Sequence, residues 1–194
     1  MVRGDKMDEG FFSSIYDSPI IAAINDINKI DNAINSPCKV TFLLAGSILN
    51  LGEMVDKLKK NNKLVYIHLD LIEGISRDIT ALKFINEYIK PDGIITTKNN
   101  IIKVAKELNI FTIQRLFLLD SLALNSGINS IKSIRPDAVE ILPGVMPKII
   151  KEIHNETRIP IIAGGLIRDK EDVIQGLNSG AVGISTSKED VWYM

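Results

Sequence analysis

Residues 159–187, IPIIAGGLIRDKEDVIQGLNSGAVGISTS, contain two short apolar runs separated by a helical segment, and this pattern decides the fold class. The run at 161–163, IIA, is apolar on both faces, as in a strand of a parallel sheet that is covered on each side. Between the two runs, DKEDVIQGLNSG places apolar residues three or four positions apart, which is typical of an amphipathic helix. The stretch therefore predicts a strand, a helix and a second, parallel strand.

The same alternation recurs along the chain as eight short runs, whose starts lie roughly 18 to 29 residues apart, about the length of one strand and one helix. Between them, segments such as LNLGEMVDKLKKNN, NNIIKVAKELN and PKIIKEIHNE have helical spacing, and several end in the Asn or Gly that favours a left-handed helix stop. The eight runs are PIIAAI from Pro19, KVTFLLAG from Lys39, KLVYIHLD from Lys63, DGIITT from Asp92, IFTIQRLF from Ile110, DAVEILPG from Asp137, IPIIAGG from Ile159 and AVGISTS from Ala181.

Eight such units predict an α/β fold, a single (β/α)8 barrel of the TIM type. We expect it to span residues 19–194, with residues 1–18 as an N-terminal tail or first helix. An open doubly wound sheet is the alternative, because roughly 200 residues is the lower limit for an eightfold barrel and the last helix, KEDVWYM, is short. The 194 residues, 45% of them hydrophobic, suit one well-buried core.

Charge and cysteine content exclude several classes of protein. With 23 basic and 24 acidic residues, the chain has no broad attraction for nucleic acid or for an anionic membrane, so any RNA contact is expected to be local. Cys38 is the only cysteine, which suits a reducing cytosol, and we expect it to be a small buried residue at a strand start. No apolar stretch is long enough to span a bilayer as a helix, and the N-terminus lacks the apolar run of a secretory signal. We therefore expect a cytoplasmic protein without a membrane partner.

The loops after the seventh and eighth runs are the strongest candidates for a binding site. In a barrel of this type the ligand lies at the carboxyl ends of the strands, and these two loops commonly hold a phosphate group. Gly164 and Gly165 let backbone N–H groups approach an anion, while Ser185, Thr186 and Ser187 add hydroxyl donors. Two tight turns and a helix cap are the alternative interpretation.

Polar side chains also end the third and fourth runs. Tyr66, His68 and Asp70 alternate onto one face, so Asp70 is a candidate ligand contact, with capping of the next loop as the alternative. His68 taken alone is more often a buried structural histidine than a functional one. Lys98 is a candidate phosphate contact, a Schiff-base lysine if desolvated, or a plain exposed lysine at a helix start.

The fifth and sixth runs each contain a charged residue. Arg115, beside Gln114, suits a bidentate contact with an oxyanion, although Asp120 is an alternative structural partner for it. Glu140 lies inside a β-run and needs a partner, for which we favour a ligand hydroxyl over an ion pair in the barrel lumen.

Several motifs that would indicate an enzyme are missing from the sequence. It contains no HxH pair, no clustered cysteines and no carboxylate series at metal-ligand spacing, and no nucleophile elbow, Walker loop or GxGxxG. We therefore predict no metal, no cofactor and no catalytic residue.

The ends of the runs, taken in order, resemble one known family. The segments HLDLIEGISRD, PDGIITTK, TIQRLFLLDS, PDAVEILPGVMPKII, PIIAGGLIRDKEDV and GAVGISTS are similar to the glycerol-3-phosphate-responsive antiterminators, regulators of bacterial glycerol-uptake operons, and the resemblance extends from Pro19 to Trp192. It implies a barrel whose effector is glycerol 3-phosphate and which, when loaded, binds the leader of a glycerol-metabolism mRNA so that transcription reads through a terminator. It also implies roles for eight residues: Gly164, Gly165, Ser185 and Thr186 would hold the phosphate, and Asp70, Lys98, Arg115 and Glu140 would line the polyol end.

Two other hypotheses stay open at this point. One is a TIM-barrel enzyme acting on a small phosphorylated polyol or sugar, such as an isomerase, an aldolase or a phosphodiesterase, because the fold alone does not settle function. The other is an interaction protein on a degenerate barrel. The RNA partner comes from the resemblance only, and the lysines at 57, 59, 60 and 63 are more typical of a solvated helix face than of an RNA patch. The RNA surface and a homo-oligomeric state are both left open.

Overall fold

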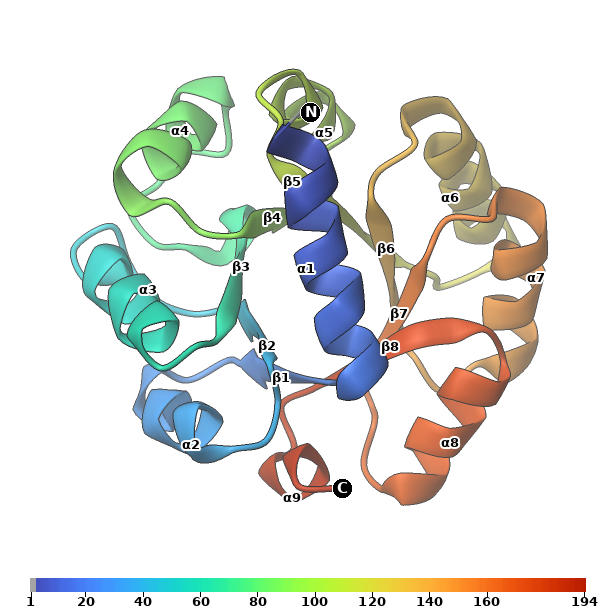
Figure 1. Ribbon diagram of the computed structural model, residues 1–194. Coiled ribbons are helices and arrows are strands. Elements are labelled where there is room, and N and C mark those ends of the chain that lie inside the picture. The colour runs from blue at the N-terminus through green and yellow to red at the C-terminus, as the bar shows by residue number, and fades with distance from the viewer. Residues whose placement is uncertain (1–2) are drawn as a thin grey trace.

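The computed structural model describes the backbone of residues 3–194 and the side chains of residues 10–194. Eight parallel strands pair in chain order, and β8 pairs back onto β1, so the sheet closes into a barrel (Figure 1). The predicted (β/α)8 barrel is confirmed, and the open-sheet alternative is wrong. The strands are β1 (Ile20–Ile24), β2 (Val40–Leu43), β3 (Leu64–His68), β4 (Gly93–Thr96), β5 (Phe111–Phe117), β6 (Ala138–Leu142), β7 (Ile161–Gly164) and β8 (Ala181–Thr186).

Helices surround the barrel, and most of the predicted helix ends are confirmed. The backbone turns left-handed at Asn62, Asn109 and Gly180, just after three of the predicted helices, as their Asn and Gly endings indicated. No helix within residues 3–194 combines the length and the apolar character needed to cross a bilayer. The helical segments are α1 (Arg3–Asp17), η1 (Ile27–Lys29), α2 (Ile30–Asn35), α3 (Leu51–Lys60), η2 (Leu69–Leu71), α4 (Ile79–Phe84), η3 (Ile85–Ile89), α5 (Asn99–Glu107), α6 (Ser121–Ile134), α7 (Pro147–Thr157), α8 (Lys170–Asn178) and α9 (Glu189–Trp192).

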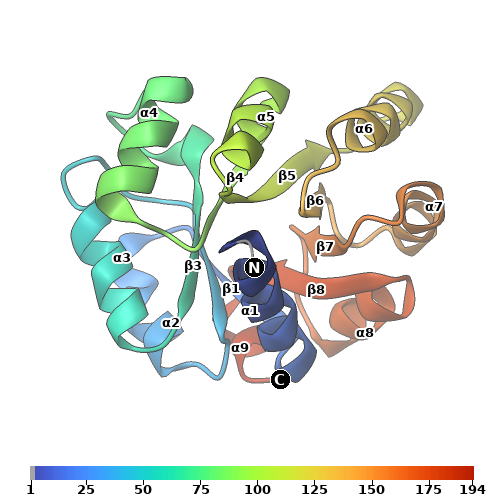
Figure 2. The same ribbon diagram turned by 45° about the horizontal axis from the view of Figure 1, so that its top comes forward.

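The first helix, α1, covers the end of the barrel where the strands begin (Figure 1, Figure 2). Phe11 is fully buried, and its ring centroid lies 5.1 Å from that of Tyr66 and 4.9 Å from that of Phe111, the first residue of β5. Phe11 and Ile15 thus complete the apolar layer that fills the lumen at the amino-terminal end of the strands. Because α1 closes this end, the carboxyl ends of the strands are left as the open end of the lumen.

The lumen changes from apolar to charged along two neighbouring strands. On β5, Phe111 and Ile113 belong to the apolar layer, and Arg115 is the next residue on that face; on β6, Glu140 follows Ala138 in the same way. Arg115 and Glu140 are also register partners across the two strands. The alternation of strand residues therefore brings both charges to the carboxyl end of the lumen.

Cys38 and Lys63 lie at the opposite, amino-terminal end of the strands. Cys38 is fully buried just before β2, as predicted, and burial raises the pKa of its thiol. Lys63 is also buried, and its Nζ donates hydrogen bonds of 2.7 Å to the carbonyl oxygens of Ser36 and Cys38. The sequence pattern grouped Lys63 with the lysines of a solvated helix face. This prediction is wrong for Lys63, which joins two chain segments inside the protein.

Candidate functional site

A cavity of about 320 Å³ opens at the carboxyl ends of the strands. Its size falls in the range of small-molecule pockets. The wall combines the charged pair of β5 and β6 with the loops that follow β7 and β8, and it includes Arg115, Glu140, Gly165, Ser185, Thr186 and Lys188. Five of the eight residues singled out from the sequence thus lie around one cavity.

Arg115 and Glu140 form a buried ion pair in the wall of this cavity. The Nε atom of Arg115 lies 2.6 Å from Oε2 of Glu140, and the two side chains are 6% and 1% exposed. The predicted alternative partner, Asp120, is wrong, because its carboxylate accepts a hydrogen bond from the Ala123 N–H and caps α6. The Nη groups of Arg115 have no acceptor among the described residues, so they are free to donate to a bound ligand.

Gly164 supports Glu140 from behind and is not itself part of the cavity wall. A Cβ atom at Gly164 would lie 2.7 Å from Oε1 of Glu140, closer than real Cβ contacts allow. Any larger residue here would push the Glu140 carboxylate out of its position against the backbone of β7. Gly164, for which the resemblance implies a phosphate contact, thus lies behind the cavity wall.

The loop after β7 bends at the cavity wall. Gly165 and Leu166 adopt successive left-handed conformations, with φ of 74° and 61°. Successive backbone N–H groups in a turn form a concave surface that can bind an anion. A left-handed backbone is unfavourable for leucine, so the loop holds Leu166 there at an energetic cost of order 1 to 3 kcal/mol.

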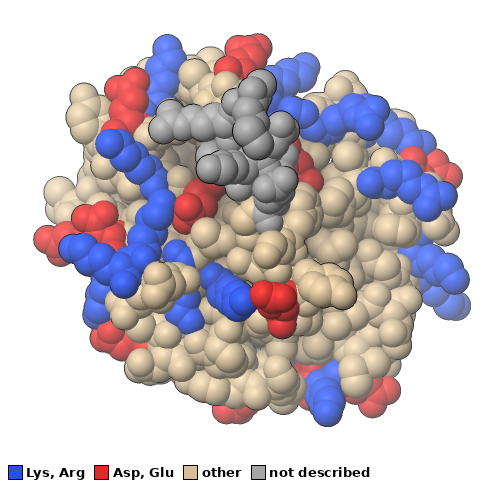
Figure 3. All heavy atoms as spheres, in the orientation of Figure 1, with Lys and Arg blue, Asp and Glu red and all other residues tan. Residues whose placement is uncertain are grey.

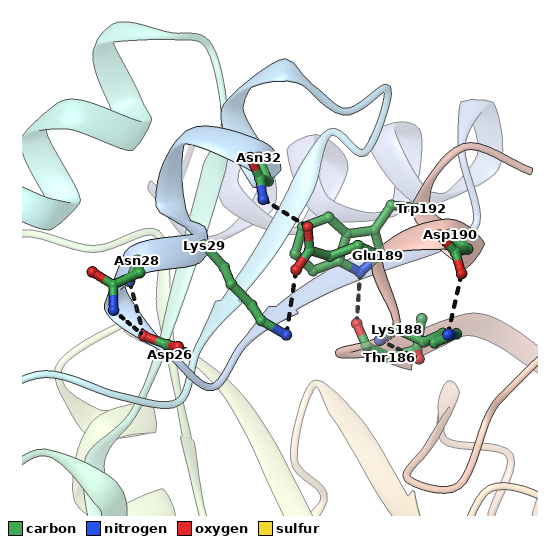
Figure 4. A network of polar contacts seen from close by, with 9 residues as sticks. All are labelled: Asp26, Asn28, Lys29, Asn32, Thr186, Lys188, Glu189, Asp190 and Trp192. Carbon is green, nitrogen blue, oxygen red and sulfur yellow. Dashed lines mark hydrogen bonds and ion pairs between the residues drawn. The ribbon is translucent and has the colours of Figure 1, made fainter.

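The loops after β7 and β8 are joined through Thr186. Its hydroxyl donates a 3.1 Å hydrogen bond to the carbonyl oxygen of Ile167 and accepts one of 3.1 Å from the N–H of Lys188. The carbonyl oxygen of Thr186 accepts a 2.7 Å hydrogen bond from Nε1 of Trp192 (Figure 4). Ser185 is buried at the cavity wall.

Lys188 is the cationic wall residue that sequence reasoning missed. The one feature of the sequence that could have pointed to Lys188 is its position directly after Ser187 in the loop that follows β8. Its Nζ lies 3.1 Å from Asp190, but both side chains are mostly exposed, at 55% and 80%, so this pair is weak and easily exchanged for an anionic ligand.

The short helix α9 is held in place by Glu189, which pairs with Lys29 of η1 and accepts a hydrogen bond from Asn32 of α2 (Figure 4).

Asp70 and Lys98, two of the residues predicted for the polyol end, lie outside the wall of this cavity. The Asp70 carboxylate accepts hydrogen bonds from the Thr96 hydroxyl and from the N–H and hydroxyl of Thr97, all at 2.8 to 2.9 Å. Burial raises the pKa of Asp70, but these hydrogen bonds outweigh it, so the net pKa lies below its usual value. Asp70 therefore connects the loop after β3 to the end of β4. Lys98 is near the surface, where its Nζ donates to the carbonyl oxygen of Arg77.

His68 is a buried, neutral histidine beside the ion pair. Burial and the positive charge of Arg115 lower its pKa to about 3, although Asp70 acts in the opposite direction. Its Nδ1 atom has no hydrogen-bond partner within the described part of the chain. The imidazole is therefore uncharged over the physiological pH range.

Stability is expected to fall as the pH is lowered, because of His68. An unfolded histidine has a pKa near 6.5 and folded His68 has one of about 3, so between these two pH values the unfolded chain binds a proton that the folded chain excludes. Within this window, each unit by which the pH falls should lower the free energy of unfolding by about 1.4 kcal/mol. Above pH 6.5, His68 should cause no such loss of stability. Urea unfolding at pH 7 and pH 5 should show this loss in the wild type and lack it in His68→Asn. An equal loss in both proteins would assign the pH dependence to other groups.

Metal-binding residues do not gather in the described part of the chain. Among residues 10–194, no group of three or more His, Cys, Asp or Glu side chains is arranged to hold a metal ion.

Comparison with known proteins identifies the family of the chain. A model of the glycerol-3-phosphate responsive antiterminator family matches residues 20–192. The glycerol uptake operon antiterminator regulatory protein of Listeria monocytogenes str. 4b F2365 is 35% identical in a crystal structure, with a TM-score of 0.87 over 90% of this chain and 95% of that one. A glycerol uptake operon antiterminator-related protein of Thermotoga maritima MSB8, also 35% identical, gives a TM-score of 0.81 over 90% and 98%.

A similar relative occurs in Escherichia coli (strain K12). The uncharacterized protein YgcP of this organism is 38% identical over 175 residues, which cover 90% of this chain and 92% of that protein. Several solved aldolases also match, at 10 to 15% identity, and these show the shared barrel fold alone.

Proposed function

The chain belongs to the glycerol-3-phosphate responsive antiterminator family, and from this membership we propose that the cavity binds glycerol 3-phosphate as an effector. The loaded barrel then binds the leader mRNA of a glycerol-metabolism operon in the cytoplasm, so that transcription reads through a terminator. The observation that carries the proposal is that the turn at Gly165 and Leu166, the loop after β8 and the buried Arg115–Glu140 pair all line one cavity of suitable size.

In this proposal the phosphate lies between the loops after β7 and β8. The N–H groups of Gly165 and Leu166, the hydroxyl of Ser185 and the ammonium of Lys188 supply donors and positive charge to it. Thr186 takes part mainly by joining the two loops, because its hydroxyl already donates to Ile167. This arrangement gives the phosphate a site built from backbone and side-chain donors.

The polyol end of the ligand lies against the ion pair. Glu140 accepts hydrogen bonds from ligand hydroxyls, and the Nη groups of Arg115 donate to ligand oxygens. Gly164 acts through the position of Glu140. Asp70 and Lys98, which lie outside the cavity wall, would act only through the loops after β3 and β4.

A phosphosugar enzyme is the second candidate, and the aldolases that share the fold are the reason to keep it. An aldolase of the Schiff-base type needs a desolvated lysine in the pocket. Lys98 lies outside the cavity wall, and the side chain of Lys188 is 55% exposed. These positions do not suit a Schiff-base lysine, and we propose binding of the ligand without turnover.

Thermal unfolding with millimolar glycerol 3-phosphate tests this function. A ligand at about 100 times its dissociation constant adds roughly 2.7 kcal/mol of stability, which raises the midpoint by several degrees in a domain of this size. Glycerol, inorganic phosphate and dihydroxyacetone phosphate serve as controls, and the ligand is recovered afterwards. We expect a shift specific to glycerol 3-phosphate, with the ligand unchanged. Consumption of the ligand, or a larger shift with another phosphorylated sugar, would favour the enzyme, and no shift at all would refute the cavity assignment.

A further inference from the structure

A second concave surface lies on the outside of the barrel, between the end of α3 and η3. This groove of about 570 Å³ is lined by Asp56, Lys59, Lys60, Tyr88, Ile89 and Lys90. Lys60 ends α3, which leads into β3, and Lys90 follows η3, which leads into β4. The groove therefore lies toward the amino-terminal ends of the strands, away from the effector cavity. In Figure 3, one concentration of Lys and Arg side chains lies on the side that α3 and α4 occupy in Figure 1.

Tyr88 combines high exposure with a stacking contact to a second aromatic ring. Its side chain is 71% exposed, and one face of its ring stacks on Phe84, with centroids 5.3 Å apart and an angle of 27° between the planes. The segment that carries it, Ile85–Ile89, is a π-helix, a conformation that is rare and frequently found at functional sites. The result is a ring supported by Phe84, with most of its surface open.

The lysines of the groove differ in their availability. Lys59 is engaged: its Nζ donates to the carbonyl oxygen of Lys90 at 3.0 Å and to Asp92 at 3.1 Å, which links α3 to the end of η3. The ammonium groups of Lys60 and Lys90 have no hydrogen bond or ion pair with any described residue. With Asp56 as the one acidic residue in the lining, the groove carries a net positive charge, whereas the whole chain has a net charge of −1.

We propose that single-stranded RNA docks in this groove, with one base stacked on Tyr88 and backbone phosphates beside Lys60 and Lys90. This inference rests on the RNA partner in the proposed function and adds the surface that contacts it. An exposed aromatic ring flanked by free cations is how proteins hold unpaired bases and their phosphates, whereas a base paired within a duplex cannot stack on a side chain in this way. The α3 lysines, which the sequence alone made more typical of a solvated helix face, are thus assigned to an RNA contact through Lys60.

Substitution of Tyr88 tests the stacking contact. The probe is the leader transcript of the glycerol operon from the organism that encodes this chain, labelled at one end and followed by fluorescence anisotropy in the presence of glycerol 3-phosphate. We expect Tyr88→Ala to bind this RNA about tenfold more weakly, and Tyr88→Phe to bind it within about twofold of the wild type, because stacking needs the ring and not the hydroxyl. Tyr16→Ala is the matched control, since Tyr16 is also an exposed tyrosine, at 91%, but lies on α1.

A salt series tests the phosphate contacts. Each phosphate contact with single-stranded nucleic acid contributes about 0.7 to the slope of log K against log salt concentration. The double variant Lys60→Gln/Lys90→Gln should therefore lower the magnitude of this slope by about 1.4. An unchanged slope would overturn this part of the proposal.

The outcomes separate this inference from the proposed function. If the wild type binds the leader RNA and Tyr88→Ala binds it equally well, the groove is not the RNA site, while the regulatory function stands. If the wild type binds no RNA at all, the RNA part of the proposed function fails and the inference fails with it. If Tyr88→Ala instead weakens self-association in sedimentation, the groove is a protein interface and the proposal is overturned. Stabilisation by glycerol 3-phosphate, measured on each variant, should be the same as in the wild type.

Discussion

Replacing Arg115 with Met is expected to lower the free energy of unfolding by about 3 to 5 kcal/mol. The substitution leaves Glu140, whose side chain is 1% exposed, as a buried charge without its partner. The matched control is Lys132→Met, because Lys132 and Glu156 are also 2.6 Å apart but 47% and 53% exposed. Exposed pairs contribute less than about 1 kcal/mol, so urea unfolding at pH 7 should separate the two variants clearly. Equal losses would mean that the Arg115–Glu140 pair is hydrated.

A double variant separates the structural role of this pair from its role in binding. Replacing both partners of a buried ion pair with apolar residues of similar volume is often close to neutral for stability. Arg115→Met/Glu140→Leu should therefore regain most of the stability lost in Arg115→Met. It should not be stabilised by glycerol 3-phosphate, because the groups proposed to contact the polyol are gone. A double variant that still responds to the ligand would remove Arg115 and Glu140 from the binding site.

Replacing Phe11 with Ala is expected to have a comparable effect, a loss of about 3 to 5 kcal/mol. Phe11 is fully buried against Tyr66 and Phe111, and its removal leaves a cavity in the layer that closes the barrel. Tyr16→Ala on the same helix should change the stability by less than about 0.5 kcal/mol, since Tyr16 is 91% exposed. Urea unfolding of both variants measures the difference. A small effect of Phe11→Ala would mean that α1 is not part of the cooperative core.

The role of α1 could not be predicted from the sequence. Residues 1–18 gave no repeating strand and helix pattern, and they precede residues 20–192, which the family model matches. Phe11 finds its partners on β3 and β5, and no local pattern reveals such distant contacts. The strands themselves were predictable because alternation and two-sided apolar runs are local signals, and the helix stops at Asn62 and Asn109 were predictable for the same reason.

The candidate site was only partly predictable. The loops at Gly165 and Ser185 could be placed because a barrel brings the loops after its seventh and eighth strands together. The partner of Arg115 could not, since it depends on the register between β5 and β6, and the sequence suggested an oxyanion or Asp120 instead. The same limit applies to Asp70: its position suggested a ligand contact, but its three donors come from the end of the next strand.

Transcription through the leader terminator is the most direct test of the central claim, that this barrel couples glycerol 3-phosphate to antitermination. A template that carries the glycerol operon leader and its terminator is transcribed by the purified polymerase of the same organism, with and without the protein and the ligand. The account predicts that read-through rises only when both the protein and glycerol 3-phosphate are present, and that the ligand is recovered unchanged. Read-through that ignores the ligand, or a ligand that is converted to product while termination stays the same, would contradict it.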